Sequence, residues 1–164
     1  MKKHWHIWVG TGAILLAVLT VLGVIFLPRL AAKSDMKELL LLAAAPEAQY
    51  VRLVDPAFKH EGILAGEGRE LELTGELLDS TRAALSALAE DFSYKGKGSA
   101  LAGAFGLHLL IKTAEGEILK LYLNETDFYA ELKGGICLFT PDDTQSYAAL
   151  YSTLQAAFSS NFGG

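Results

Sequence analysis

An unbroken run of apolar or small residues occupies positions 7–27, and no charged side chain lies between Lys3 and Arg29. As an α-helix these 21 residues cover roughly 30 Å at about 1.5 Å each, which matches the hydrocarbon core of a bilayer. The run therefore predicts a transmembrane helix over Ile7–Leu27, with the lipid bilayer as a partner. Pro28 follows directly, and we expect the helix to end or kink there.

A cleaved export signal is the main alternative to this anchor, because Lys2 and Lys3 precede the apolar run. The run is longer than the usual signal-peptide core of about 7–15 residues. Arg29 and Leu30 also break the small-x-small pattern of a cleavage site. We therefore expect residues 1–33 to remain as an N-terminal tail and uncleaved anchor.

Basic residues flank both ends of the predicted span. Lys2 and Lys3 lie on one side, and Arg29, Lys33 and Lys37 lie on the other, so the positive-inside rule gives nearly balanced counts. A tail of six residues is easily left in the cytoplasm while the rest is exported. We therefore expect the following domain to be extracytoplasmic.

A short juxtamembrane helix is expected next. Ser34 with Glu38 four residues later resembles a helix start, and it predicts a helix over about 36–44. The four leucines at 39–42 are apolar all round, which favours burial against the domain or seating at the membrane interface. Residues 34–48 are therefore assigned to a juxtamembrane helix and connector.

Alternating apolar and polar positions then predict strands over 49–54, 70–73, 105–112, 117–123, 128–132 and 136–139. Short turns join the last four of these strands, which predicts a four-stranded antiparallel meander. Segment 93–103 contains Gly96, Gly98 and Gly103, and we expect it to be a flexible connection.

Two helices complete the domain. Thr74 predicts the N-cap of a helix over about 75–91. Thr140 predicts a second N-cap, with Pro141 at the first helical position and Asp142–Asp143 near the positive end of the helix dipole. The apolar stripe of this closing helix consists of Tyr147, Leu150, Tyr151, Leu154 and Phe158.

This stripe needs a surface that buries it, and the meander supplies one. Residues 49–164 therefore predict an α+β fold. It consists of an antiparallel sheet, the four-stranded meander plus one or two additional strands, with helices packed mainly on one face. A single domain of this length can bury one hydrophobic core.

The charge of the domain excludes one class of partner. Residues 34–164 carry ten Lys and Arg side chains against nineteen acids, a net charge of −9. Proteins that bind nucleic acid carry basic patches or stripes. We therefore expect no nucleic-acid partner.

The chemical motifs do not support catalysis or cofactor binding. Segment 98–103 has the glycine spacing of a phosphate-binding loop, but Ala104 and Phe105 stand where Lys and Ser or Thr are needed. Cys137, the only cysteine, lies in an apolar stretch and is expected to be a buried hydrophobe. No metal-ligand spacing joins the four histidines, which are His4, His6, His60 and His108.

The paired acids have structural explanations. Asp142–Asp143 fit the first turn of the closing helix, and Glu90–Asp91 fit a solvated helix end. A serine would have to meet His60 or His108 through the fold to act as a nucleophile. We therefore assign no catalytic, cofactor-binding or metal-binding residue and no cofactor.

The order of elements over 49–158 resembles a small extracytoplasmic α+β domain of uncharacterised lipoproteins and single-pass membrane proteins of Gram-positive bacteria. The resemblance is carried by the acidic strand that leads into a helix, 71–77, and by the Tyr-Lys-Gly connection at 93–96. It implies extracytoplasmic placement and carries over no catalytic residue.

The expected function is that of a membrane-tethered extracytoplasmic binding or protein-interaction module that is not an enzyme, with a protein partner at the cell envelope. Tyr94, Tyr122 and Tyr129 are candidate contact aromatics. One alternative is a membrane-anchored enzyme that uses scattered acids and His108. A pilin-like assembly subunit ranks last, because Pro28 interrupts the helix and no acid lies at its start.

Overall fold

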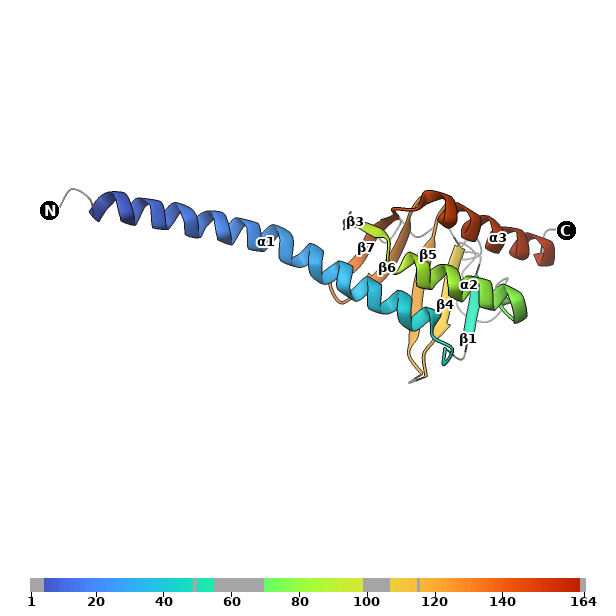
Figure 1. Cartoon of the computed structure of the whole chain (residues 1–164). Coiled ribbons are helices and arrows are strands. Elements are labelled where there is room, and N and C mark those ends of the chain that lie inside the picture. The colour runs from blue at the N-terminus through green and yellow to red at the C-terminus, as the bar shows by residue number, and fades with distance from the viewer. Residues whose placement is uncertain (1–4, 49, 55–69, 99–106, 115, 163–164) are drawn as a thin grey trace, which may run out of the picture.

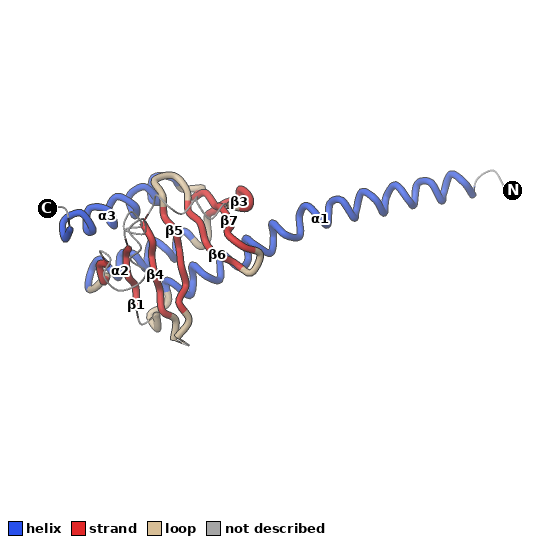
Figure 2. The backbone as a smooth tube through the Cα atoms, turned by 180° about the vertical axis from the view of Figure 1, so that it is seen from behind, coloured by secondary structure: helices blue, strands red, loops and turns tan. Residues whose placement is uncertain are grey.

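A single continuous helix, α1 (Trp5–Ala44), joins the apolar N-terminal segment to the rest of the chain. The computed structural model describes residues 5–48, 50–54, 70–98, 107–114 and 116–162, without the side chains of 5–15 and 50–54. The first half of α1 protrudes alone, and its second half lies against the domain (Figures 1 and 2).

The predicted helix end at Pro28 is wrong, and so is the separate helix that was expected to begin near Met36. Pro28 lies inside α1, and the helix continues on both sides of it. An internal proline removes one backbone hydrogen bond and costs about 3 kcal/mol in a soluble helix, but apolar spans tolerate it. Burial of the later α1 residues in the core favours the continuous helix.

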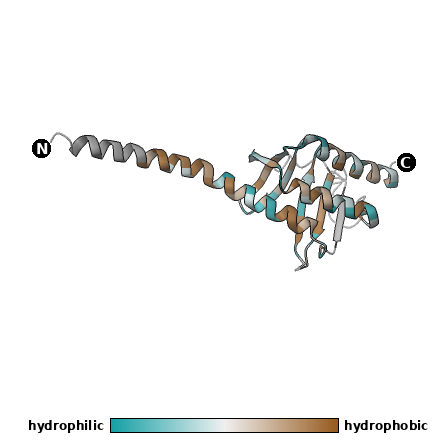
Figure 3. Cartoon of the chain, viewed as in Figure 1, coloured by the Kyte–Doolittle hydropathy of each residue, from teal (hydrophilic) through white to brown (hydrophobic). Residues whose placement is uncertain are grey.

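From Leu16 onward, the protruding part of α1 exposes its apolar side chains. Leu16, Val24 and Leu27 are 68%, 70% and 66% exposed, and Figure 3 colours most of this described stretch as hydrophobic. Among the described residues, α1 is the one helix that is long and apolar enough to cross a membrane. This finding agrees with the predicted N-terminal apolar helix.

The second half of α1 places one stripe of side chains in the core. The stripe consists of Ala32, Met36, Leu39, Leu40 and Ala43, each at most 9% exposed. These positions recur at helical spacing, so they lie on one face of α1. The leucine run is therefore divided, because Leu41 and Leu42 remain about 40% exposed.

The described strands form a seven-stranded antiparallel sheet in the order β2-β1-β4-β5-β6-β7-β3. They are β1 (Tyr50–Val54), β2 (Glu70–Glu72), β3 (Phe92–Lys97), β4 (Leu107–Lys112), β5 (Ile118–Leu123), β6 (Phe128–Leu132) and β7 (Gly135–Pro141). The predicted meander is confirmed as β4 to β7, whose strands are neighbours in chain order.

Strand β3 replaces the flexible connection expected after position 92. It pairs with β7 at the sheet edge, with Tyr94 opposite Phe139. The glycine-rich composition concealed an aromatic alternation in which Phe92 and Tyr94 face the core. Gly96, at φ +152°, occupies the irregularity in this pairing, where glycine is tolerated without a steric penalty.

Helices α2 (Gly75–Leu88) and α3 (Thr144–Phe162) join the second half of α1 in one layer on one face of the sheet (Figures 1 and 2). Helix α2 packs against both α1 and α3. This arrangement confirms the predicted α+β class. The predicted stripe of α3 is also buried in full.

An aromatic cluster connects α1 to the sheet. The ring of Phe92 contacts Phe128 and Phe139 edge-on, at centroid distances of 6.1 and 5.5 Å. The Lys33 ammonium of α1 lies 5.3 Å from the centroid of the Phe92 ring, within cation–π distance. Strand β3 is therefore held between β7 and α1.

A pair of adjacent leucines tests the docking of α1. Leu40→Ala removes a side chain that is 0% exposed, whereas Leu41→Ala removes one that is 42% exposed. We expect Leu40→Ala to lower the free energy of unfolding by about 2–5 kcal/mol and Leu41→Ala by under about 1 kcal/mol. Denaturant unfolding of the full chain in detergent, followed by near-UV circular dichroism, measures both. Equal losses would contradict the observed face of α1.

Candidate binding site

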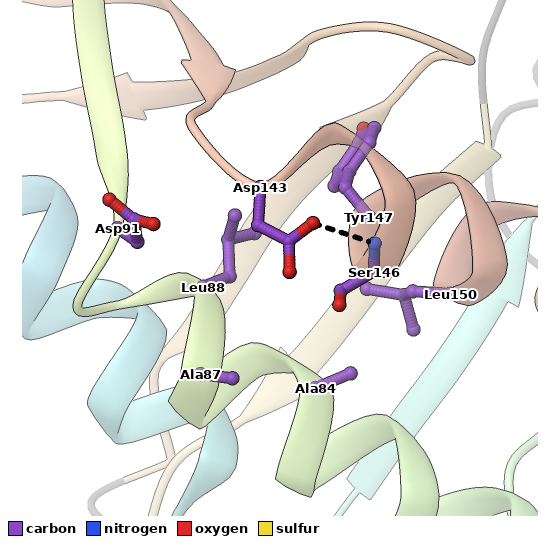
Figure 4. Close-up of a pocket in the computed structure, with 8 residues that line it drawn as sticks. All are labelled: Ala84, Ala87, Leu88, Asp91, Asp143, Ser146, Tyr147 and Leu150. Carbon is purple, nitrogen blue, oxygen red and sulfur yellow. Dashed lines mark hydrogen bonds between the residues drawn. The ribbon is translucent and has the colours of Figure 1, made fainter.

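A groove between α2 and α3 is the candidate functional site (Figure 4). Its volume is about 200 Å³. The lining residues are Ala84, Ala87 and Leu88 of α2, Asp91 beyond the end of α2, Asp143 before α3, and Ser146, Tyr147 and Leu150 of α3. Typical small-molecule pockets are about 300–1,000 Å³, so this groove has room for little more than one side chain.

Small side chains create the space. Leu85 and Leu88 of α2 are buried in the core, and Ala84 and Ala87 lie next to them on the side that faces α3. Alanine has no atoms beyond Cβ, so α2 leaves a hollow where larger side chains would fill the contact with α3. Leu150 of α3 supplies apolar surface opposite.

Asp143 holds a negative charge at the rim of the groove. Its Oδ1 accepts hydrogen bonds from the backbone N–H groups of Gln145 and Ser146, both at 3.1 Å. Asp143 is therefore the N-cap of α3, and the prediction that Thr140 caps this helix is wrong. Thr140 and Pro141 instead belong to β7, because pairing with β3 extends that strand to Pro141.

Hydrogen bonds from the Ser146 side chain and backbone hold the pKa of Asp143 below its ordinary value of 3.8. Asp91 is the other acid that lines the groove, and Asp142 fixes its backbone in place. Asp142 accepts a 2.7 Å hydrogen bond from the Ser93 hydroxyl, and its backbone N–H donates to the Asp91 carbonyl at 3.1 Å. The rim therefore carries negative charge above a largely apolar floor.

Tyr147 is a structural member of the groove. Its hydroxyl lies 2.9 Å from the Asn124 carbonyl oxygen and 2.7 Å from that of Asp127, and both carbonyls accept from it. Burial is the main cause that raises the pKa of this hydroxyl far above its ordinary value. The hydroxyl therefore remains protonated, and its hydrogen bonds point away from chemistry in the groove.

His108 does not reach this groove. It lies on β4 and belongs to neither of the helices that form the groove. Along β4 it alternates with Leu107 and Leu109, which face the helices, so His108 faces the other side of the sheet. His108 is nevertheless only 4% exposed, and its ring meets Tyr122 edge-on at 4.6 Å. The structure thus separates this histidine from the acids of the groove by the thickness of the sheet.

The three candidate contact tyrosines are packing residues. Tyr129 is 8% exposed, and its ring approaches Gly98, where an added Cβ would lie 3.0 Å from it. Tyr94 packs on Phe139 at 5.6 Å, and Tyr122 packs on His108. The expectation that these aromatic side chains are exposed is therefore wrong for Tyr129, whereas Tyr94 and Tyr122 are half-buried.

The remaining sequence candidates give no second site. Cys137 is 3% exposed, and burial is the main cause that raises its pKa. Its expected burial is confirmed. His4, His60 and all but the first glycine of the 98–103 motif lie outside the described residues, as does the side chain of His6. Within the described part of the chain, no three His, Cys, Asp or Glu side chains are grouped to hold a metal ion.

Sequence reasoning missed the groove itself. Asp91 and Asp143 were recognised only as helix-end acids, and Ala84 and Ala87 drew no attention. The available signal was the pair of alanines on the α2 face opposite to Arg82, but helix pairing is not encoded in any local pattern. No protein-family model, curated protein or solved structure gives a significant match to this chain.

The Asp143 cap gives a pH-dependent prediction. Because its pKa is lower in the folded protein than in the unfolded chain, the charged cap stabilises α3 fully at pH values above 3.8. This stabilisation is lost as the pH falls from there through the lower pKa of the folded state. We expect Asp143→Ala to melt at a lower temperature than wild type at neutral pH, with the gap closing in acid.

Thermal melts of the full chain across the acid range measure this difference. Asp143→Asn is the matched control, because asparagine is also a good N-cap but does not titrate. It should melt close to wild type at neutral pH. A gap between Asp143→Ala and wild type that is independent of pH would contradict the role of the charged carboxylate.

Proposed function

We propose that this chain is a membrane-tethered extracytoplasmic module that binds a protein partner at the cell envelope. The observation that carries the tether is α1, whose apolar residues from Leu16 to Leu30 are exposed while its second half is part of the domain core. Exposure of this much apolar surface is unfavourable in water and favourable in a bilayer.

The binding function is supported by the groove between α2 and α3. Its apolar floor and acidic rim match a side chain with an aliphatic stem and a cationic head, such as Lys or Arg of a partner protein. The described lining of the groove contains no imidazole or thiol, and its two hydroxyls are already engaged, that of Ser146 by Asp143 and that of Tyr147 by backbone carbonyls. Binding therefore explains this arrangement better than catalysis.

The enzyme alternative is not favoured by the geometry of the described residues. It relied on scattered acids together with His108, and the groove acids Asp91 and Asp143 lie on the helix side of the sheet, away from His108. A general base has to come within hydrogen-bond distance of the reacting group, directly or through one water. His108 and the groove acids do not share such a site.

The pilin-like alternative gains one observation, because α1 continues through Pro28. An unbroken helix with an apolar first half and a packed second half would allow lateral assembly of α1 helices. Ala13 and Ala17 are spaced for close helix contact, but this pattern is short. We rank assembly second to the tethered binding module.

Assembly is tested by cross-linking through α1. Under the tethered-module proposal, Val18→Cys with Val24→Cys in native membranes gives mainly monomers and dimers after oxidation. These positions are 49% and 70% exposed on different sides of α1, so each chain can join two neighbours, and extended ladders of higher oligomers would favour the assembly subunit. Cys137→Ser in the same chain removes the native thiol, so that any ladder must arise from positions 18 and 24.

The side of the membrane is tested by labelling. With the domain outside, Ser159→Cys on the exposed face of α3 reacts in intact cells with a thiol reagent that cannot cross membranes. Wild-type chain stays unlabelled, because Cys137 is 3% exposed. The reciprocal variant Lys3→Cys should react only after lysis. Labelling of the two variants in the opposite order would overturn the extracytoplasmic orientation.

The groove is tested by photo-crosslinking in native membranes. A benzophenone amino acid at Ala87 lies in the groove, whereas the same group at Ala83 lies on the exposed face of the same helix outside the groove. We expect a discrete adduct from position 87 that is weakened several-fold by Asp91→Asn with Asp143→Asn and by high salt. Equal adducts from both positions, or none from position 87, would contradict binding at the groove.

A further inference from the structure

A second pocket lies where α1 leaves the domain. It is lined by Pro28, Ala31, Ala32 and Asp35 of α1, Tyr94 and Lys97 of β3, and Leu132, Lys133, Gly134 and Cys137 around the β6–β7 turn. Its volume is about 320 Å³. Figures 1 and 2 both show the β3 edge of the sheet as the edge nearest the protruding half of α1.

The geometry of α1 gives the level of this pocket relative to the bilayer. Pro28 directly follows Leu27, the last residue of the apolar run, and Asp35 lies seven residues further along α1. Seven residues of helix rise about 10 Å, enough to extend through one headgroup layer of about 5–7.5 Å. With Ile7–Leu27 in the hydrocarbon core, the pocket therefore lies at the level of the lipid headgroups.

The charge of the pocket is positive, although the domain as a whole is acidic. Lys97 and Lys133 line it from two different elements and are both exposed. Neither lysine belongs to the one ion pair found among the described residues, which joins Lys37 to Glu90. Asp35 contributes the opposing carboxylate, so the two lysines leave a net positive charge of one.

Arg29 adds a further cation beside the pocket. Burial raises the pKa of the Tyr94 hydroxyl, and the nearby Arg29 charge acts in the opposite direction. Tyr94 lines the pocket, so Arg29 lies close enough to influence it. The aromatic ring and the small residues Ala31 and Ala32 provide a largely apolar wall below these cations.

An apolar track leads from the bilayer to the pocket. Pro28, Ala31 and Asp35 share one face of α1, and Val24 and Val21 continue this face by one and two turns toward the N-terminus. Both valines are more than half exposed. An acyl chain that lies along them would have its phosphate next to the pocket.

We propose that this pocket binds the phosphate of an anionic phospholipid from the bilayer that α1 crosses, with Lys97 and Lys133 as its cationic contacts. The inference rests on the proposed membrane anchorage. A lipid is the favoured source of the phosphate, because the pocket joins an apolar helix face on one side to cations on the other. Binding would also hold the β3 edge of the sheet against the membrane surface.

The test measures lipid preference of the full chain in phosphatidylcholine vesicles. Traces of spin-labelled phosphatidylglycerol or phosphatidylcholine report, by electron paramagnetic resonance, which lipid is immobilised at the protein. We expect wild type to prefer phosphatidylglycerol several-fold. Lys97→Gln with Lys133→Gln should lose most of this preference, since one interfacial lysine changes association by about fivefold.

A charge-matched control is Lys112→Gln with Lys120→Gln. These lysines are exposed on β4 and β5, away from the β3 edge, and their removal changes the net charge by the same amount. The control should keep the wild-type preference, as should Lys97→Arg with Lys133→Arg. Near-UV circular dichroism verifies that each variant is folded. Equal preference in all variants, or equal loss in the control, would overturn the proposed site.

A final arm separates the sources of phosphate. Glycerol 1-phosphate added at constant ionic strength should leave the phosphatidylglycerol preference unchanged if the lipid is the ligand. Its abolition by the soluble phosphate would overturn the lipid assignment. Release of wild-type protein from the vesicles by alkaline carbonate would instead contradict the anchorage, independently of the lysine variants.

Discussion

The burial of one stripe of α1 in the domain core is the interaction on which the rest of the structure depends. Met36, Leu40 and Ala43 are fully buried, although the large apolar side chains about four turns earlier on the same helix are 45–70% exposed. Burying each large apolar side chain is worth about 1.5–3 kcal/mol. The anchor and the domain are therefore one folded unit, and residues 32–43 cannot be removed as a mere stalk.

This coupling determines how the domain is presented. A flexible stalk would allow any face of the domain to approach the bilayer. A continuous helix that packs against α2 and β3 instead fixes the β3 edge next to the protruding half of α1. Lys33, which lies over the Phe92 ring, adds a contact at the same place. The groove beside α2 then has a set position relative to the span.

The parts of the fold that local patterns encode were predictable, and those that depend on distant partners were not. Alternation of apolar and polar residues predicts the β4–β7 meander, and apolar residues at helical spacing predict the α3 stripe. Both predictions are confirmed. Strand β3 was missed, because its glycines hid two core aromatics and because its partner β7 lies forty residues later along the chain. The helix end predicted at Pro28 was wrong for a related reason, because burial of the later α1 residues outweighed the free-energy cost of a proline inside a helix.

The groove depends on distant partners in the same way. Its two acids, Asp91 and Asp143, are visible in the sequence, but the sequence does not show that α2 and α3 bring them to one groove.

The two pockets carry opposite charge, and this matters under the proposed membrane tether. A cationic side chain that fits the acidic groove belongs to a partner that is also attracted to anionic lipid. Attraction to the surface concentrates such a partner in the layer where α1 already holds the domain. The lysines of the membrane-edge pocket, by contrast, favour lipid and disfavour that partner. Under these two proposals, the opposite charges would direct lipid to the β3 edge and the cationic partner to the groove between α2 and α3.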